Sequence, residues 1–593
     1  MTAQFRDLLL WLMGGMLAFA VALLWSSGSY IDGEYHPMGV DSFLHARRIL
    51  DTYHDLSAFY QWDTMSFAPV GTYNHWPWSY DFGHALALKL FVPISGLSPA
   101  TVLMHIPAVW TFVNVGLLLL ICRQLGLTSF FKFIVLIIFA LMPLNQAIHA
   151  VGKIDHDFME LTFVLLALWG HLFWSNNYES LRRAILLGVI LGFAIGVNIS
   201  MFILQIPFLI SLGLLWLKGQ QIPILSSLGF AFSLILSTLA IAVFSLPLQH
   251  GYFDFSYLSW FQVYIALCTG VFVLLGSYLN YTVRHLISFI VVGLILAIPV
   301  ASQLVGGAGY LMTSESEFLS NITETQSVWA LRHLAIVHYT ALVLFVPFII
   351  IGGVIALFKI RQTRMLIFTC TSLFGLSLLC LQYRFNHFGS YSLYLVPLCY
   401  LSVWLSNKGT RVRLASSMIT VVLTIVLLAP SLPFLLLERE PGWSDAYARS
   451  RPLYLHLSSM CESNPGIVLT PLANANYVRY HTNCSVLGTA MYGADNEQTL
   501  LGNRALYLLN ASPAETLSSD LGIKYVLAVR SWGTSADIPE SARLFNETGL
   551  NGRLLGGQQD FPAGFRYIIG AEFENQDKLV LGLARLFEIE PQE

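Results

Sequence analysis

The sequence predicts a polytopic α-helical membrane protein that ends in a small soluble α/β domain. Only 11% of its residues are charged, against about 25% in soluble domains, and 56% are apolar, with a mean hydropathy of +0.65. Of its 34 Asp and Glu residues, 18 follow Leu437, so the last quarter of the chain has a different composition. We therefore expect a membrane domain over residues 1–437 and a soluble domain over residues 438–593.

About thirteen apolar runs are long enough to cross a membrane. They lie near residues 8–27, 101–121, 130–148, 159–174, 184–199, 201–217, 222–246, 257–279, 285–303, 336–358, 365–381, 388–405 and 414–436. No clear small-residue cleavage site follows the first run. We therefore expect this run to stay in the protein as a span rather than to be removed as a signal peptide.

Basic residues fall in alternate connections between these runs. One set of short connections carries Arg123, Lys132, Arg182, Arg183, Lys218, Arg284, Lys359, Arg361, Arg364, Lys408, Arg411 and Arg413. By the positive-inside rule, this set predicts a multi-pass protein of the cell inner (plasma) membrane with a cytoplasmic N-terminus. The long segments 28–100 and 304–335 and the soluble domain would then lie outside the cytoplasm.

The soluble domain contains short runs of strand-forming residues. They predict strands at residues 466–472, 524–530 and 566–573. Cys461 and Cys484 are its two cysteines, whereas the other five lie in or beside apolar runs. Since an oxidising compartment allows thiols to pair, we expect a disulfide between them.

Polar groups gather at the edge of an apolar run in the segment VGKIDHDFMELTF, residues 151–163. Asp155, His156, Asp157 and Glu160 lie within six residues of one another. Helix capping would need one such carboxylate, and ionisable groups at membrane depth are costly and usually functional. Their oxygens suit Mg²⁺ or Mn²⁺, and the lack of neighbouring thiolates argues against a structural zinc site. Metal binding and stabilisation of the helix start both explain this pattern.

Three further charged residues stand out on the predicted outer side. Asp41 follows the first span, where it could also be a helix N-cap. Glu324 lies in the long loop, where it could also be a solvated carboxylate. Arg384 stands at the edge of another span, where bidentate binding of a phosphate suits it better than snorkelling. Together with a metal, these groups would stabilise a departing phosphate or pyrophosphate.

The order of these elements resembles that of the catalytic subunit of oligosaccharyltransferases, which are membrane glycosyltransferases of the GT-C class. The resemblance covers nearly the whole chain. Asp41 matches the family's first catalytic Asp, and the "DHD" of residues 155–157 is close to the "DHH" of archaeal members. Glu324 takes the Glu position of the loop motif, with Asn321 where Ser or Thr is usual. Arg384 matches the arginine that meets the donor's pyrophosphate.

The resemblance implies a role for each of these residues. The implied ligands of Mg²⁺ or Mn²⁺ are Asp41, Asp155, Asp157 and Glu324. Asp41 and Glu324 would also polarise the acceptor as catalytic groups, and Arg384 would hold the donor phosphate. His156 and Glu160 are candidates for supporting the metal ligands.

The acceptor-reading motif of the family is missing. The family reads the Ser or Thr of an Asn-x-Ser/Thr acceptor with WWDYG, and this chain has LANAN at residues 472–476. The remaining acceptor-side candidates are Asn474, Asn476 and Tyr477. Without aromatic walls and a carboxylate, the site would gain nothing from a Ser or Thr hydroxyl. We therefore expect that acceptor recognition by this chain does not depend on an Asn-x-Ser/Thr sequon.

These features predict a membrane enzyme that moves a glycan from a polyprenyl phosphate or pyrophosphate donor to a protein or glycolipid acceptor. In the long outer segment, His75, Trp76 and Trp78 could stack on sugar or lipid, or be interfacial aromatics. One alternative is a GT-C transferase that uses a polyprenyl-phosphate monosaccharide and a glycolipid acceptor. Others are a non-catalytic relative and a secondary transporter, although a transporter would hold its ionisable residues near the bilayer midplane. The net charge of −3 gives no reason to expect a nucleic-acid partner.

Overall fold

The computed structural model divides the chain into two compact units. Unit 1 comprises Met1–Ser27, Trp76–Tyr80 and His105–Glu438, and unit 2 comprises Gly28–His75, Asp81–Met104 and Arg439–Glu593. The described residues are 3–24, 28–60, 62–74, 76–303, 305, 326–333, 335–338, 340–360, 362–406, 408–432, 443–489, 496–530, 548–556, 561–574 and 580–590. Unit 2 thus combines the C-terminal quarter of the chain with most of the segment between the first two spans.

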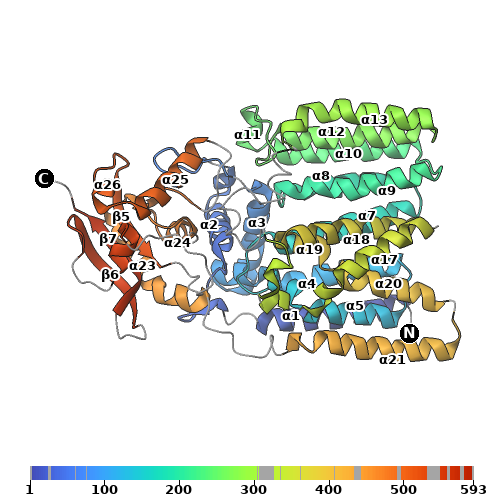
Figure 1. The fold of residues 1–593 in the computed structure, drawn as a ribbon, viewed down its shortest axis with the longest axis horizontal. Helices are drawn as coiled ribbons and strands as arrows, with labels where there is room; N and C mark the ends of the chain where they lie inside the picture. Colours follow the sequence, from blue (N-terminus) through green and yellow to red (C-terminus); the bar gives the residue numbers. More distant parts are fainter. Residues whose placement is uncertain are drawn as a thin grey trace. The chain divides into compact units, whose positions relative to one another are not determined.

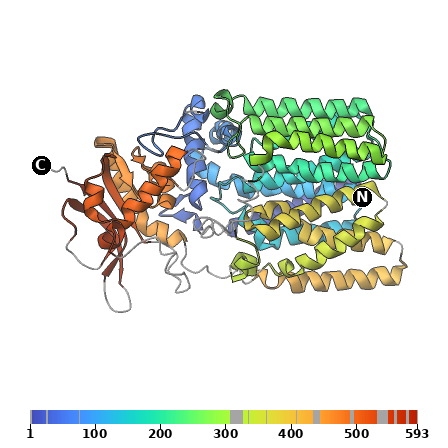
Figure 2. The same ribbon diagram turned by 45° about the horizontal axis from the view of Figure 1, so that its top comes forward.

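Unit 1 is built from apolar helices that run alongside one another (Figures 1 and 2). Among the described residues, eleven helices are long and apolar enough to cross a membrane. They include α1 (Ala3–Leu24), α4 (Pro99–Gln124), α7 (Asp157–Ser175), α9 (Gln205–Leu217, after the 3-10 turn η3, Ile199–Leu204), α10 (Ile224–Ala242), α12 (Trp260–Tyr278), α13 (Val283–Ala297, continued by η4, Ile298–Val300), α17 (Val346–Lys359, after η7, Ala341–Phe345), α18 (Thr363–Leu381), α20 (Ser392–Ser406) and α21 (Thr410–Leu428). The chain is a multi-pass membrane protein, as the composition predicted.

Shorter elements connect these spans. They are α11 (Leu246–Gln249), η6 (Ala330–His333), α16 (Ala335–His338), η8 (Tyr383–Phe385) and α19 (Asn386–Gly389). The last two precede α20 and belong to the same candidate span, Tyr383–Ser406. This span begins with the segment that carries Arg384.

Two of the thirteen predicted spans are shorter helices in the structure. The run 130–148 forms α5 (Ser129–Leu141) and α6 (Pro143–Ala147), because Pro143 keeps Met142 in an extended conformation and ends the first helix. The run 184–199 forms α8 (Leu181–Ala194), which has only 14 residues. The prediction of about thirteen spans is corrected to eleven among the described residues.

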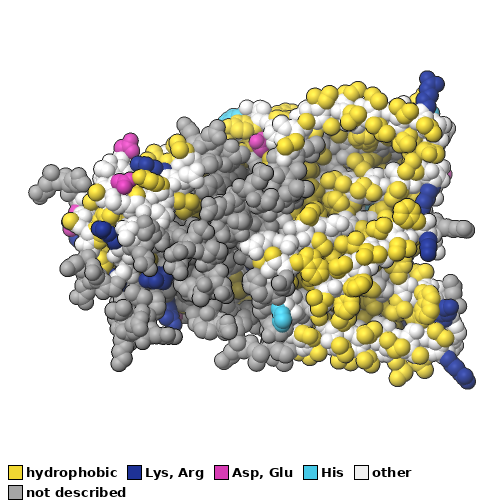
Figure 3. All heavy atoms as spheres, viewed as in Figure 1, with side chains coloured by type: hydrophobic (Ala, Val, Ile, Leu, Met, Phe, Trp, Pro, Cys, Tyr) yellow, Lys and Arg dark blue, Asp and Glu magenta, His cyan; other side chains and the backbone are white. Residues whose placement is uncertain are grey.

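Side-chain chemistry distinguishes the surface of unit 1. Figure 3 shows apolar side chains along its helices and Lys and Arg gathered at one end of them. Leu294 on α13 is 66% exposed and Ile425 on α21 is 62% exposed. Apolar surface of this extent suits contact with lipid, and basic ends match the pattern that the sequence predicted.

Unit 2 is organised around a five-stranded mixed sheet with the strand order β4-β3-β5-β7-β6. The strands are β3 (Ile467–Leu469), β4 (Ser485–Val486), β5 (Ile523–Val529), β6 (Phe565–Glu574) and β7 (Val580–Ile589). β3 pairs in parallel with β4 and β5, whereas β7 pairs antiparallel with β5 and β6. The predicted small α/β domain therefore forms, with two strands that its sequence did not reveal.

Helices complete unit 2. They are α2 (Val40–His54), η2 (Leu56–Tyr60), most of α3 (Trp78–Ser95), α23 (Trp443–Ser463), α24 (Leu472–His481), α25 (Asn496–Asn510), α26 (Pro513–Leu517) and α27 (Leu550–Leu555), together with the small hairpin β1 (Tyr30–Ile31) and β2 (Glu34–Tyr35). The predicted strand at 466–472 is too long, because Pro471 leads into α24. Residues 472–476 therefore begin a helix.

A disulfide links two elements of unit 2. Cys461, in the last turn of α23, is joined to Cys484, directly before β4. The two residues are 23 positions apart and both are buried. The pair is the one that the sequence pointed to, and it closes the loop that contains β3 and α24.

Candidate functional site

The turn before α7 positions the first carboxylate of the candidate site. Gly152 has a φ of +86°, which only glycine adopts at little cost, and it reverses the chain ahead of the helix. Asp155 then accepts a hydrogen bond from the backbone N–H of His156 at 2.9 Å and one from Lys153 Nζ at 3.1 Å. Asp155 is only 4% exposed, so the ammonium of Lys153 compensates a buried charge.

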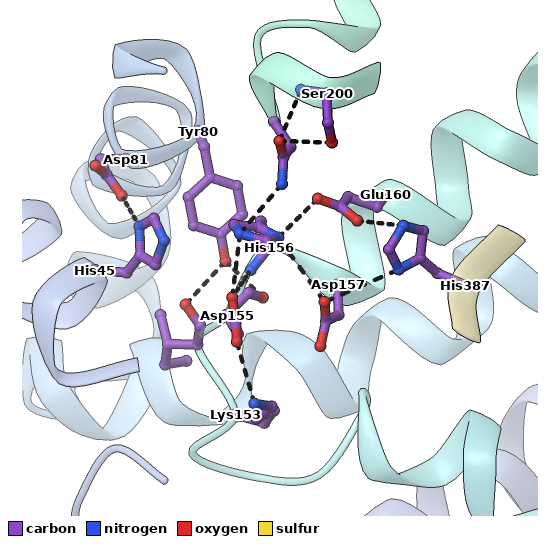
Figure 4. A network of polar contacts seen from close by, with 12 residues as sticks. His45, Tyr80, Asp81, Lys153, Asp155, His156, Asp157, Glu160, Ser200 and His387 are labelled. Carbon is purple, nitrogen blue, oxygen red and sulfur yellow. Dashed lines mark hydrogen bonds and ion pairs between the residues drawn. The ribbon is translucent and has the colours of Figure 1, made fainter. Parts of the chain in front are cut away.

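Glu160 lies one turn into α7 and binds two imidazoles (Figure 4). Its Oε1 is 2.8 Å from Nδ1 of His156, and its Oε2 contacts Nε2 of His387 on α19. Asp157 Oδ1 lies 3.9 Å from His156 Nδ1 and 4.0 Å from His387 Nδ1. Two carboxylates of α7 and two imidazoles thus form one cluster, in which Glu160 is 1% exposed.

The charge of this cluster favours a bound cation. Burial lowers the pKa of His156, but the negative charges of Glu160 and Asp155 outweigh it and raise the pKa to about 10. A proton is therefore held on the imidazole by the surrounding carboxylates. The same carboxylates would attract a divalent cation, which would displace this proton when it bound the imidazole nitrogen.

Aromatic and amide groups enclose His156. The ring of Trp76 lies 4.3 Å from its ring, and Asn198 Nδ2 is 3.4 Å from its Nε2. Asn198 is itself fixed, because its Oδ1 accepts hydrogen bonds of 2.9 Å from the N–H and the hydroxyl of Ser200. The hydroxyl of Tyr80 donates to the backbone oxygen of Asp155 at 3.1 Å. Trp76 thus has a defined place at the cluster, whereas His75 lies outside the described residues.

The donor atoms of the cluster fit a metal ion. His156, Asp157 and Glu160 each offer one ligand atom, and these atoms all lie within 4.8 Å of one another. Carboxylate oxygens suit Mg²⁺ and Mn²⁺, while imidazole nitrogen suits Mn²⁺ and Zn²⁺ rather than Mg²⁺. The structure therefore supports a divalent metal at the start of α7, with a mixed oxygen and nitrogen donor set.

The other residues assigned to the metal lie elsewhere in the chain. Asp41 is in the first turn of α2 in unit 2, whose N-cap is Gly39, so the N-cap interpretation of Asp41 is wrong. A carboxylate in a first helical turn is still favoured by the helix dipole. Glu324 and Asn321 lie outside the described residues. The cluster of unit 1 thus contains one of the four predicted ligands, Asp157. Asp155 lies beside it, with its Oδ1 3.4 Å from His156 Nε2.

A buried ion-pair network fixes the helix that carries Asp41. His45 Nδ1 is 2.8 Å from Asp81 Oδ1, and Arg48 Nε is 2.9 Å from Asp81 Oδ2. Burial raises the pKa of Asp81, but the charges of Arg48 and His45 outweigh it and hold the pKa below its usual range. α2 is therefore anchored to α3 through side chains on the same helix as Asp41.

Arg384 lies at the start of a candidate span, as predicted. It is half-buried in η8, and its guanidinium carbon is 5.7 Å from the centre of the Phe385 ring. His387 follows three positions later, and sequence analysis assigned it no role. The spacing in "RFNH" was a usable signal, since residues three apart lie on one face of a helix.

The three acceptor-side candidates are buried in unit 2. Asn474 donates a hydrogen bond to Tyr454 Oη at 3.2 Å, and Asn476 donates one to the backbone oxygen of Val40 at 3.2 Å. The ring of Tyr477 lies 4.5 Å from that of Phe43. None of the three is more than 3% exposed. Their contacts hold α24 against α2 and α23, which is a structural role.

Solved structures share the fold of this chain. The sequence matches no family model and no curated protein. The archaeal oligosaccharyltransferase AglB from Archaeoglobus fulgidus, in complex with an inhibitory peptide and a dolichol-phosphate, aligns over 98% of this chain and 74% of its own, with a TM-score of 0.75 and 15% identity. An Archaeoglobus fulgidus oligosaccharyltransferase tethered to an acceptor peptide with the NVT sequon aligns over 99% and 89%, with a TM-score of 0.73 and 13% identity.

A mycobacterial enzyme is a more distant match. The arabinofuranosyltransferase AftD aligns over 100% of this chain and 42% of its own, with a TM-score of 0.51 and 12% identity. At these identities the likeness concerns the fold. The predicted fold, a polytopic helical membrane domain with a C-terminal α/β domain, is confirmed, and the chain shares it with AglB.

Proposed function

We propose that this chain is a membrane glycosyltransferase that moves a glycan from a polyprenyl phosphate or pyrophosphate donor to an acceptor outside the cytoplasm. The observation that carries the proposal is the cluster of the buried His156, Glu160 and His387 with the half-buried Asp157 at the start of a span, in a chain with the fold of AglB. Soluble proteins rarely bury such a cluster without a function, and a membrane domain has still less reason to. AglB is seen with dolichol-phosphate, which is a polyprenyl phosphate.

The cluster is proposed to hold a divalent metal. Asp157 and Glu160 supply oxygen donors, and His156 supplies a nitrogen. A structure of the Archaeoglobus fulgidus enzyme contains Zn and sulfate. A bound cation supplies positive charge for the phosphate of the donor as that group departs. Because the donor set includes imidazole, we favour Mn²⁺ over Mg²⁺.

The chain's own residues would then divide the work between donor and acceptor. Arg384 would bind phosphate oxygens bidentately from η8, at the start of the span that also carries His387. Asp41 and Glu324 are proposed to polarise the acceptor, and Asp155 to join the metal ligands. We further propose that the chain lies in an inner (plasma) membrane, with its N-terminus in the cytoplasm and unit 2 outside the cytoplasm. The alternation of basic connections along the sequence supports this topology.

Substitution of Asp157 tests this proposal. The purified chain is reconstituted with a polyprenyl-linked donor and Mn²⁺, and release of the polyprenyl phosphate is measured. Asp157→Asn should lower the rate by at least about 100-fold, because loss of metal–phosphate stabilisation costs several kcal/mol. Glu179→Gln, at an exposed carboxylate between α7 and α8, should match the parent. Equal rates for Asp157→Asn and the parent would remove the cluster from the mechanism.

The burial of Asn474 and Asn476 in α24 favours an acceptor other than a sequon peptide. The second candidate function is therefore that of a GT-C enzyme that acts on a glycolipid. Asn474 and Asn476 face internal partners, and residues 472–476 offer no aromatic pocket for a hydroxyl. Asn-x-Thr and Asn-x-Ala peptides should therefore be modified equally or not at all. Strong preference for the Asn-x-Thr peptide would contradict this, and incorporation of label into the lipid fraction would identify a glycolipid acceptor.

A further inference from the structure

Unit 1 contains a second site, at the other end of α7 from the carboxylate cluster. It is a cavity of about 420 Å³, a size typical of small-ligand sites. Its walls are α9, α12 and α13, and they include Gly213, Phe272 and Phe289. The 19 residues of α7 separate this cavity from the candidate active site by about 28 Å. The cavity is therefore separate from the carboxylate cluster.

The walls of this cavity are apolar and only its mouth is polar. The mouth is formed by Tyr178, after α7, and by Gln220 and Gln221, after α9. The hydroxyl of Tyr178 is buried and has no hydrogen-bond partner among the described residues. A buried hydroxyl without a partner is unfavourable, and an oxygen acceptor on a ligand would satisfy it.

Basic residues lie in the connections next to the mouth. The connections that form it, residues 176–183, 218–222 and 280–285, contain the charged residues Glu179, Arg182, Arg183, Lys218 and Arg284. Four of these five are cationic. Lys218 and Arg284 are exposed, and in the sequence they lie two residues from Gln220 and Leu286, which line the cavity. Lys218 Nζ donates one hydrogen bond to the backbone oxygen of Ile360 at 2.9 Å, and its other N–H groups are available to a ligand. This end of unit 1 is the one where Figure 3 shows Lys and Arg gathered.

We propose that this cavity binds an acyl chain of an anionic phospholipid from the cytoplasmic leaflet. The apolar walls on α9, α12 and α13 would take the chain, and the hydroxyl of Tyr178 would donate a hydrogen bond to the ester carbonyl. Lys218 and Arg284 would meet the phosphate of the head group, since anionic lipid accumulates beside exposed basic residues. A soluble metabolite suits the cavity less well, because its walls offer almost no polar partners.

Two glycines supply a matched pair of variants. A Cβ added at Gly213 of α9, in the cavity wall, or at Gly352 of α17, away from it, would meet no atom within 4 Å. Gly213→Leu should therefore fill the cavity without a clash, while Gly352→Leu makes the same change elsewhere on the surface. Tyr178→Phe removes the hydroxyl and leaves the apolar wall.

The test measures lipid retained by the full chain. Each variant is exchanged into nanodiscs that contain equal amounts of phosphatidylglycerol and phosphatidylcholine, then released into mild detergent and examined by native mass spectrometry. The parent and Gly352→Leu should retain one phosphatidylglycerol, and Gly213→Leu should retain none. Tyr178→Phe should retain about threefold to tenfold less, because one hydrogen bond is lost.

A second measurement places the lipid in the cavity. Trp216 lines the cavity, so phosphatidylglycerol with a brominated acyl chain should quench its fluorescence. Gly213→Leu should abolish this quenching of Trp216. Equal retention of the two lipids by the parent, or equal retention of phosphatidylglycerol by Gly213→Leu and the parent, would overturn the proposal. Neither result depends on glycosyl transfer, so the proposed function is tested separately.

Discussion

Glu160 shows how a single residue organises the candidate site. The helical spacing of four places its carboxylate beside His156, and its second oxygen meets His387 from a different element. A carboxylate that is 1% exposed needs such partners, because an unpaired buried charge is strongly unfavourable. Glu160 therefore fixes the orientation of the His156 imidazole. His156, Asp157 and Glu160 together form the metal-binding group.

His387 should be required for tight metal binding. His387→Ala removes one of the two partners of Glu160 and leaves that carboxylate free to turn away from His156. Loss of such supporting contacts typically weakens metal affinity by about 10- to 100-fold. Titration of the purified chain with Mn²⁺, followed by electron paramagnetic resonance, measures this affinity. His456→Ala, at an exposed histidine of α23, should bind Mn²⁺ with the affinity of the parent. Equal Mn²⁺ affinities of His387→Ala and His456→Ala would show that His387 does not support the metal site.

Asp63 should make unit 2 sensitive to acid. Burial raises the pKa of Asp63, but Arg479, 3.4 Å away, and the hydrogen bonds of Ser66 outweigh it and lower the pKa below its usual range. Because the folded pKa lies below the unfolded one, the stabilisation is present above about pH 4 and is lost as the pH falls through the folded value. Melting temperatures of the full chain between pH 2 and pH 7 measure this loss.

The matched variant for this pH dependence is Asp63→Asn. It should melt at a lower temperature than the parent at neutral pH, and the gap should narrow as the pH falls below 4. Asp520→Asn, at an exposed carboxylate after α26, should follow the parent throughout. A gap that stays constant across the range would show that the charge of Asp63 contributes nothing to stability.

At the scale of elements, close helix packing depends on small residues. A Cβ added at Gly188 of α8 would lie 2.5 Å from the backbone oxygen of Phe230 on α10, and one at Gly192 would lie 2.8 Å from that of Leu234. Backbones that approach this closely leave no room for side chains. α8 is short for a span, and this contact explains how it is nevertheless held in unit 1.

Gly188→Val should therefore destabilise the membrane unit. The added side chain must push α8 and α10 apart, and such overpacking typically costs about 1–3 kcal/mol. Thermal unfolding of the full chain in detergent, followed by a thiol-reactive dye that reports on buried cysteines such as Cys370, measures the change. Gly352→Val, whose added Cβ meets open space, should shift the midpoint little. Equal midpoints for the two variants would disprove the close contact.

At the scale of the whole molecule, the chain joins a unit with apolar, lipid-facing helices to a unit with the composition of a soluble domain. Figure 3 shows the contrast, with Lys and Arg at one end of the helices of unit 1. Unit 2 contains a disulfide between Cys461 and Cys484, which persists in oxidising compartments. Both features support a cytoplasmic location for the basic ends and an extracytoplasmic one for unit 2.

Labelling of introduced cysteines should reveal this orientation. Ser518→Cys lies at an exposed position of unit 2, and Asn177→Cys lies in the exposed connection between α7 and α8. A membrane-impermeant maleimide applied to intact cells should label the first variant and reach the second only after permeabilisation. The parent chain, whose five free cysteines lie in unit 1, provides the background. Labelling of Asn177→Cys in intact cells would reverse the proposed topology.

Several of these features follow from local sequence. Length and hydropathy determine the spans, because a segment in lipid must satisfy its backbone hydrogen bonds within itself. Asp155, His156, Asp157 and Glu160 could be grouped in advance, since a turn and the first turn of a helix keep them together in any fold. The two shortened spans could not be recognised by hydropathy alone, because Pro143 and the packing of α8 decide where those helices end.

The sequence by itself determined the membrane class, the acidic cluster and the cysteine pair, since each depends on composition or on residues close together in the chain. Only the tertiary structure decided that His387 meets Glu160, that Asn474 and Asn476 are buried in α24, and that β4 and β7 complete the sheet. These contacts join residues far apart in sequence. Their geometry arises when helices and strands pack to bury apolar surface, and no local pattern encodes it.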